Sequence, residues 1–230
     1  MYLVGHVALG YLLGKAVSKL WKVDVNIPLL SIASVIVDVD ILIPSLKHRG
    51  PMHSLIVLTL LFTPLLFMLR GRAVPYFVAL IQHPLIGDYL AGGGVRLLWP
   101  LTGQSYGLAI PIGSPINIAF EWVLFAVSIL AMVEMGDLQT VFKLGLLKQA
   151  FIVVVAAVAF IFIIQTPLGF LNPHFIPYEL IIPYSVYFTI FVAYAVRSLK
   201  AVWGGLKQRW KFRLDQGKEG GLKMVGNGDC

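Results

Sequence analysis

Cysteine is almost absent from this chain, since Cys230 is the only one among 230 residues. A single thiol excludes an internal disulfide, and it excludes metal sites that are built from cysteine thiolates. Charge is also scarce, because 13% of the residues are charged while 58% are hydrophobic. This composition excludes an ordinary soluble domain and is typical of a chain that lies in a membrane.

Long apolar runs predict an all-α fold, a polytopic membrane helix bundle of about seven transmembrane helices. A helix needs about 20 apolar residues to cross a hydrocarbon layer of roughly 30 Å. No charged segment precedes the first run, so we expect a retained helix and not a cleaved signal peptide. The candidate spans are Tyr2–Leu20, Ile27–Pro44, Ser54–Leu69, Ala73–Ala91, Ile116–Met135, Ala150–Thr166 and Leu180–Val196.

Basic residues predict the orientation of these spans. The net charge of +7 is concentrated after the last span, in Arg197, Lys200, Lys207, Arg209, Lys211, Arg213, Lys218 and Lys223. Basic residues are favoured on the cytoplasmic side, so we expect a multi-pass protein of the cell membrane with its N-terminus outside and its C-terminus in the cytoplasm. Lys47, Arg49 and Arg96 depart from this rule, which suggests cations kept for an anionic substrate.

The chain divides into two predicted parts, a membrane-embedded domain over residues 1–197 and a cytoplasmic tail over residues 198–230. In the tail, apolar residues recur at roughly helical spacing between basic ones, which predicts an amphipathic helix on anionic headgroups. These residues are Trp203, Leu206, Trp210 and Leu214. Gly217–Cys230 is glycine-rich and polar, so we expect it to be disordered. The basic balance therefore indicates the lipid bilayer as partner, and no nucleic-acid binding is expected.

Side chains of metal-ligand type interrupt the first four apolar runs. Ionisable groups are costly at membrane depth, so they usually mark a site or a pathway. The predicted orientation places all of them on the outer side, although they were not used to derive it. We therefore expect one metal site between helices at the outer face, with seven candidate ligands: His6, Asp38, Asp40, His48, His53, His83 and Asp88.

The segment from His48 to Ser54 is the sharpest motif. A glycine and a proline between its two histidines break the backbone, so both imidazoles can converge although they are five residues apart. The helix that begins near Ser54 points its N–H groups toward the same place, which favours an anion. Arg49 adds a planar group suited to phosphate or carboxylate. The alternative is a polar outer loop that Ser54 caps.

Roles for these residues follow from the motif. We expect His48 and Arg49 to be catalytic, and we expect an anionic substrate to bind Arg49, Ser54 and Arg96. The glycine-rich turn beginning at Gly92 could bring its backbone close to a ligand.

Spacing raises a question for the aspartates. Asp38 and Asp40 would diverge by about 200° on a regular helix, so both face one site only if the helix loosens there. Otherwise one is a ligand and the other orients a histidine. His83 and Asp88 are five residues apart, where four would align them, and Pro84 with Gly87 can carry a bulge in that helix.

Several residues have plainer interpretations. His83 could be a buried imidazole bonded to a carbonyl, and His6 could pack in the core. Glu121 beside Trp122 is typical of a pair that reaches the membrane interface. His174 is expected in a loop, and Ala150–Gln165 is expected to be scaffold without chemistry.

The motifs in the first half of the chain resemble the YdjM-like family of membrane-bound metal-dependent hydrolases. They are His6, Asp38-Val-Asp40, His48-Arg-Gly-Pro-Met-His53-Ser54, His83 with Asp88, and Gly94-Val-Arg-Leu-Leu-Trp-Pro100. That family is distantly similar to zinc-dependent phospholipase C and P1-type nucleases, so the resemblance implies a zinc-type hydrolase acting on phosphoesters. The family spaces the last histidine and aspartate by four residues, and this chain spaces them by five.

We therefore expect a metal-dependent hydrolase, a phosphoesterase acting on a substrate such as a phospholipid headgroup. Imidazole and carboxylate ligands suit one or two divalent ions, with zinc favoured and manganese or iron(II) as alternatives. A divalent-cation transporter or channel could use the same residues, but a transporter should carry ionisable groups through its full depth and often an internal repeat. An intramembrane metalloprotease is weaker, since no His-Glu-x-x-His occurs. A purely structural membrane protein would leave the cluster unexplained.

Overall fold

The computed structural model describes residues 1–43, 48–139 and 177–224. These residues form helices and no strand, and their only ladder-like contacts are two isolated bridges, Ala91 with Ile110 and Val95 with Tyr106. The all-α prediction is thus confirmed. The elements are α1 (Leu3–Leu20), α2 (Ile27–Val35), η1 (Ile36–Leu42), η2 (Pro51–His53), α3 (Leu55–Leu69), η3 (Arg70–Ala73), α4 (Val74–Gln82), η4 (His83–Asp88), α5 (Pro115–Glu134), η5 (Tyr178–Leu180) and α8 (Ile181–Met224).

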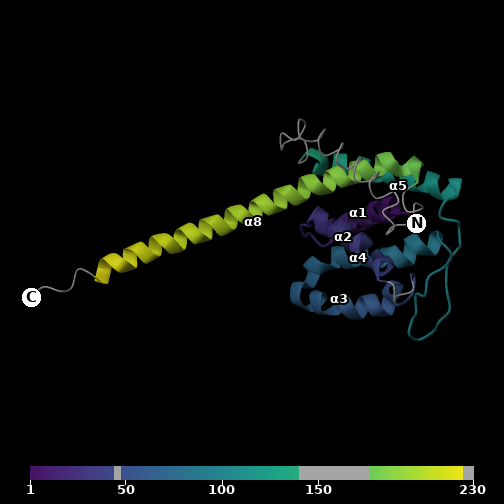
Figure 1. Ribbon diagram of the computed structural model, residues 1–230, viewed down its shortest axis with the longest axis horizontal. Helices are drawn as coiled ribbons and strands as arrows, with labels where there is room; N and C mark the ends of the chain where they lie inside the picture. Colours follow the sequence, from purple (N-terminus) through teal and green to yellow (C-terminus); the bar gives the residue numbers. More distant parts are fainter. Residues whose placement is uncertain (44–47, 140–176, 225–230) are drawn as a thin grey trace, which may run out of the picture.

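Three helical stretches of the described chain are long and apolar enough to cross a membrane: Leu55–Asp88, Pro115–Glu134 and Tyr178–Gly205. The first stretch reverses direction near Arg70, whose φ is 51°, so α3 and α4 run antiparallel (Figure 1). The prediction of about seven such helices is therefore not supported. The expected span Ala150–Thr166 and the expected loop residue His174 lie outside the described residues.

The predicted span over Ile27–Pro44 is not supported: it is absent from the stretches of the described chain that are long and apolar enough to cross a membrane, and the α-helix there ends at Val35. Asn26 caps its beginning by accepting a hydrogen bond from the Leu29 N–H at 3.1 Å. Nine residues make an α-helix of only about 13 Å, well short of a hydrocarbon layer. The chain continues as the 3₁₀ helix η1, which carries Asp38 and Asp40.

Helix α1 is the centre of the core and packs against α2, α4 and α5. Two of its glycines allow α2 to approach closely. A Cβ on Gly10 would lie 2.3 Å from the Ser34 Cβ, and a Cβ on Gly14 would lie 2.5 Å from Leu30 Cδ1. Because such distances are shorter than atoms tolerate, a larger residue at Gly10 would push α2 away, whereas at Gly14 the end of the Leu30 side chain would have to shift.

The bundle has two ends, which differ in the helix termini that meet there (Figure 1). We call one the cluster end, where α1 and α3 begin and α4 finishes. At the other, the basic end, the ring of Trp21 lies 3.0 Å from the position of a Cβ on Gly71, so the end of α1 meets the α3–α4 turn. Lys22 and Arg72 line one cavity there, of about 420 Å³.

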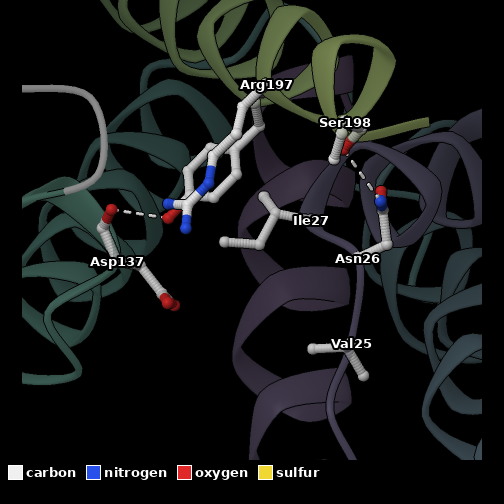
Figure 2. Close-up of a pocket in the computed structure, with 8 residues that line it drawn as sticks. Val25, Asn26, Ile27, Asp137, Arg197 and Ser198 are labelled. Atoms are coloured by element: carbon white, nitrogen blue, oxygen red, sulfur yellow. Dashed lines mark hydrogen bonds between the residues drawn. The ribbon is translucent and has the colours of Figure 1, made fainter. Parts of the chain in front are cut away.

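A second cavity at the basic end, of about 300 Å³, lies between α2, α5 and α8. Figure 2 shows its lining, where Asn26 Nδ2 donates to Ser198 Oγ at 3.1 Å. The Asp137 carboxylate is 2.8 Å from Lys15 Nζ, so a partly buried ion pair joins α1 to the end of α5. These contacts attach α8 to the beginning of α2 and the end of α5 to α1.

Helix α8 projects far beyond the rest of the protein (Figure 1) and is continuous from Ile181 to Met224. It therefore passes the predicted boundary at residue 197 without a break, and the two-part division of the chain stays a prediction. Residues 217–224 are helical, so the expected disorder of Gly217–Cys230 is wrong for this portion. The exposed Trp203 agrees with the expected interfacial role of the tail.

Candidate metal centre

All the candidate ligands come together at the cluster end. They form three overlapping groups, and within each group the ligand atoms lie within 4.8 Å of one another. The groups are Asp38, Asp40, His48 and His53; His6, Asp38 and His83; and His53, His83 and Asp88. The seven side chains thus converge in one place, as the sequence predicted.

Four ligand atoms form the middle of this cluster. His53 Nε2 lies 3.4 Å from Asp38 Oδ1 and 3.2 Å from Asp88 Oδ2. His83 Nε2 lies 3.2 Å and 3.4 Å from the same two oxygens. Atoms bound to one ion at about 2.0–2.2 Å are separated by about 2.9–3.5 Å, so the spacing suits a shared divalent ion.

Both imidazoles are held with Nε2 toward this point. His83 Nδ1 donates a hydrogen bond to the Ser34 carbonyl at 2.7 Å, which leaves its Nε2 with the lone pair. His53 Nδ1 lies 3.1 Å from Asp40 Oδ2, an ion-pair contact outside hydrogen-bond geometry. A carbonyl or carboxylate behind a histidine is the usual way in which proteins orient a metal ligand.

Buried polar atoms without a hydrogen-bond partner supply an independent test of the fit. In the described part of the chain they include His53 Nε2, Asp88 Oδ2 and His6 Nδ1. Buried polar groups are nearly always paired, so several orphans in one place need an explanation. A bound cation would satisfy the nitrogen and oxygen lone pairs together, so these residues fit a metal ion.

The helix that carries His83 and Asp88 has an unusual turn. Residues His83–Asp88 form a π-helix, which confirms the bulge expected from Pro84 and Gly87. The wider turn brings residues five apart onto one face, and both side chains meet the cluster although four residues would align on a regular α-helix. The five-residue spacing is therefore compatible with both being ligands.

The two neighbouring aspartates divide their roles. Asp38 faces the Nε2 of His53, whereas Asp40 faces the Nδ1 of the same ring. The 3₁₀ turn of η1 thus sends the two carboxylates to opposite sides of one imidazole. This matches the arrangement of one ligand with one orienting partner.

His6 completes the cluster from α1. Its ring stacks on that of His83, with centroids 3.5 Å apart and planes 6° from parallel. Its Nε2 is 3.8 Å from Asp88 Oδ1. Gly87 makes room for it, because a Cβ there would lie 2.3 Å from His6 Cε1.

Substituting Gly87→Ala should therefore displace His6 and disturb the stack on His83. We expect metal affinity to fall by about 10- to 100-fold, the range seen when groups that position metal ligands are lost. Calorimetric titration with zinc would measure this. Gly113→Ala is the control, because a Cβ there meets nothing closer than 3.8 Å. Equal affinities in both variants would contradict the role of Gly87.

His48 and Arg49, the expected catalytic residues, lie at the rim. His48 is 40% exposed, and its Nδ1 is 2.9 Å from Asp40 Oδ1. Arg49 has a φ of 61°, and its Nη2 is 3.2 Å from Asp88 Oδ1. Its guanidinium packs on Gly92, where a Cβ would lie 1.9 Å from Nη2. The turn that begins at Gly92 thus leaves room for the Arg49 guanidinium at the rim of the cluster.

Ser54 and Arg96, the other expected substrate-binding residues, both have structural roles. Only the capping role of Ser54 had been considered from the sequence. Ser54 is fully buried and caps α3, since its Oγ accepts from the N–H groups of Ile56 and Val57. The Ser54 hydroxyl donates to the Trp99 carbonyl. Arg96 donates its backbone N–H to the Arg49 carbonyl at 3.3 Å. Substrate binding by Ser54 and Arg96 stays a prediction.

His53 lies among three carboxylates, just before the apolar stretch Leu55–Asp88 begins. Burial by itself would lower the pKa of this imidazole, but the carboxylates of Asp38, Asp40 and Asp88 raise it to about 10. Three carboxylates around one ring therefore attract positive charge to this point. Either a proton or a divalent ion would supply that positive charge.

The structural role of Glu121 was not predicted from the sequence. The interfacial position expected for it is wrong. It is fully buried, and its carboxylate accepts hydrogen bonds from the N–H groups of Tyr2 at 2.6 Å and Gly5 at 3.1 Å. Asn117 Nδ2 also donates to it, at 3.0 Å. A carboxylate from α5 thus caps α1 one turn before His6. Its position inside an apolar run was the only available signal.

We predict that Glu121→Ala lowers the free energy of unfolding by about 2–4 kcal/mol, because two buried N–H groups lose their acceptor. Glu121→Gln should lose less, since its amide oxygen can still accept. Thermal unfolding of the detergent-solubilised protein would measure both. The control is Glu134→Ala, at an exposed position of the same helix. A loss no greater than in this control would contradict the capping role.

Comparison with known proteins identifies the family. A model of the YdjM inner membrane protein family matches residues 1–168, a range that contains every residue of the cluster together with Glu121. No curated protein and no solved structure matches the chain. Since the match covers most of the sequence, the chain belongs to the YdjM inner membrane protein family.

Proposed function

We propose that this membrane protein is a metal-dependent hydrolase that acts on a phosphoester, such as a lipid headgroup. The observation that carries the proposal is the set of four atoms from His53, His83, Asp38 and Asp88, in which each imidazole nitrogen lies 3.2–3.4 Å from both carboxylate oxygens. A divalent ion held there supplies Lewis-acid polarisation of a phosphoryl oxygen and a water activated near neutral pH. Zinc is favoured, while manganese and iron(II) suit the same ligands.

The overlap of the ligand groups supports room for one or two ions. Asp38 belongs to two groups, one with His53 and one with His6 and His83. If two ions were held, Asp38 would serve both groups, and a pair of ions would stabilise both the attacking and the leaving oxygen of a phosphoester.

The rim residues supply the remaining roles in this proposal. Arg49 binds the anionic phosphoryl group and stabilises the negative charge that grows on it. His48 is partly exposed and is held by Asp40, so its other ring nitrogen can transfer a proton to or from the reacting group. The shared Asp40 carboxylate thus orients both a metal ligand and a general acid or base.

The direct test uses the purified wild-type protein in detergent and in vesicles. Metal content is measured by mass spectrometry, and phosphate-containing products are followed after addition of a phospholipid or a soluble phosphodiester. We expect at least one zinc-type ion per chain and metal-dependent release of product. If the metal-loaded protein cleaves neither substrate and instead carries divalent ions into vesicles, the hydrolase proposal fails and the transporter takes its place.

We further propose that the cluster end faces outward and the basic end faces the cytoplasm. Support comes from the helix ends: α1 and α3 begin at the cluster end (Figure 1), whereas Lys22 and Arg72 line a cavity where α1 ends and α3 turns into α4, and basic residues favour the cytoplasmic side.

This orientation predicts a labelling pattern for single cysteines in a Cys230→Ser background. Gly103→Cys, where a Cβ meets nothing within 4 Å, should react with a membrane-impermeant maleimide in intact cells. Asp24→Cys, exposed at the basic end, should react only after permeabilisation. The reversed pattern would overturn the proposed orientation and with it the outer placement of the site.

A further inference from the structure

The loop between α4 and α5 lacks the charge that exposed loops usually carry. No charged residue occurs between Arg96 and Glu121. Instead, large apolar side chains are exposed on it: Leu98 is 41% exposed, Leu101 81% and Leu108 59%. An apolar surface of this kind marks a place where a protein or a membrane is contacted. We call the segment Leu98–Leu101 the apolar lip.

The apolar lip is fixed in place beside the candidate metal centre. The Leu55 N–H donates to the Leu97 carbonyl at 2.9 Å, and the Ser54 hydroxyl donates to the Trp99 carbonyl. Both donors directly follow His53 in the chain. The backbone of Val95 and Tyr106 pairs across the base of the loop, at 2.8 and 2.9 Å. The apolar lip is therefore a positioned part of the cluster end.

The helices on either side of the loop also expose large apolar side chains. Leu60 and Leu61 on α3 are 67% and 63% exposed, and Ile116 on the first turn of α5 is 72% exposed. Both helices belong to stretches long and apolar enough to span the bilayer. In Figure 1 the loop folds back toward the beginning of α3. The loop thus presents its exposed leucines at the end of the bundle where the apolar helix α3 begins.

We propose that the apolar lip inserts into the bilayer and places the rim of the metal centre, at His48 and Arg49, at the depth of the lipid headgroups. A substrate with a phosphoester headgroup then reaches Arg49 from the side while its acyl chains stay in the membrane. The substrate half of this inference rests on the proposed hydrolase function. The insertion of the lip does not, because it follows from exposure, lack of charge and continuity with α3 and α5.

Insertion is tested with a polarity-sensitive fluorophore on Leu101→Cys, in the Cys230→Ser background and in phosphatidylcholine vesicles. We expect blue-shifted emission that lipids brominated on their acyl chains quench. Gln104→Cys, exposed in the same loop, is the control and should remain accessible to aqueous iodide. Emission like that in water at position 101 would overturn the inference. Blue-shifted emission that brominated lipids fail to quench would also overturn it and would indicate contact with a second protein chain.

Lateral entry is tested with Leu101→Gln, since this side chain makes no contact with the cluster. Hydrolysis of vesicle phospholipid should fall by about tenfold, the effect expected for one leucine removed from an apolar environment. Hydrolysis of a soluble phosphodiester should not change, and Gln104→Ala should leave both activities unchanged. Equal losses on both substrates would overturn lateral entry. If wild type cleaves neither substrate while position 101 is inserted, the hydrolase proposal fails and the membrane-inserted lip remains.

Discussion

The His53→Ala variant is expected to lose its metal. The His53 ring is fully buried, and its Nε2 faces both Asp38 and Asp88, so no other side chain can take its place. Loss of a group that merely orients a ligand costs 10- to 100-fold in affinity, and loss of the ligand itself should cost at least about 100-fold. Zinc titration and metal analysis of the monodisperse, detergent-solubilised variant would measure this.

The comparison variant is His48→Ala, whose ring is 40% exposed at the rim. Its loss of affinity should be smaller, because its Nδ1 faces Asp40 and its ring makes a T-shaped contact with the His53 ring, while none of the four central atoms belongs to it. Full metal occupancy in His53→Ala, in a protein that remains folded by thermal unfolding, would refute the metal centre.

Arg49→Ala is expected to keep its metal and lose hydrolysis of phosphoesters. The Arg49 guanidinium is 3.2 Å from Asp88 Oδ1, so its removal makes that carboxylate more available to a cation. Loss of one group that stabilises transition-state charge costs about 10²- to 10³-fold in kcat. Arg49→Lys should rescue only in part, since an ammonium lacks the planar pair of donors.

Metal content and product release on the same preparations distinguish the two rival functions. A guanidinium above the cluster repels a free divalent cation that approaches, whereas it attracts a phosphoryl group. Normal hydrolysis by Arg49→Ala would contradict the role assigned to this residue. Faster uptake of divalent ions by Arg49→Ala vesicles would favour a transporter.

The residues of the cluster could be predicted from sequence because their chemistry is so unfavourable in apolar runs. His6, Asp38 and His83 each interrupt a hydrophobic stretch, and a buried ionisable group is kept only where it has a partner. The π-helix was also foreseeable, since Pro84 and Gly87 both weaken a regular turn. That the residues converge followed from their positions at alternate helix ends, which a helical hairpin brings to one side.

Other features could not be predicted, because they depend on contacts between distant segments. The two aspartates after Val35 raised the possibility that the helix loosens there, but nothing local indicates that the α-helix ends at Val35 and tightens into η1. Glu121 resembles an interfacial carboxylate until α1 is placed against α5, where it finds the N–H groups of Tyr2 and Gly5. Tertiary packing decides both cases, and a linear pattern does not contain it.

The position of the cluster at one end of the bundle, and not halfway along it, bears on the electric field across the membrane. A divalent ion that reached a site at half depth would cross half of that field, which changes its binding free energy by about 2.3 kcal/mol for every 100 mV. An ion that reaches His53 and Asp88 from their own side crosses almost none of it. If the proposed centre binds a divalent ion, its affinity should therefore be almost independent of the membrane potential.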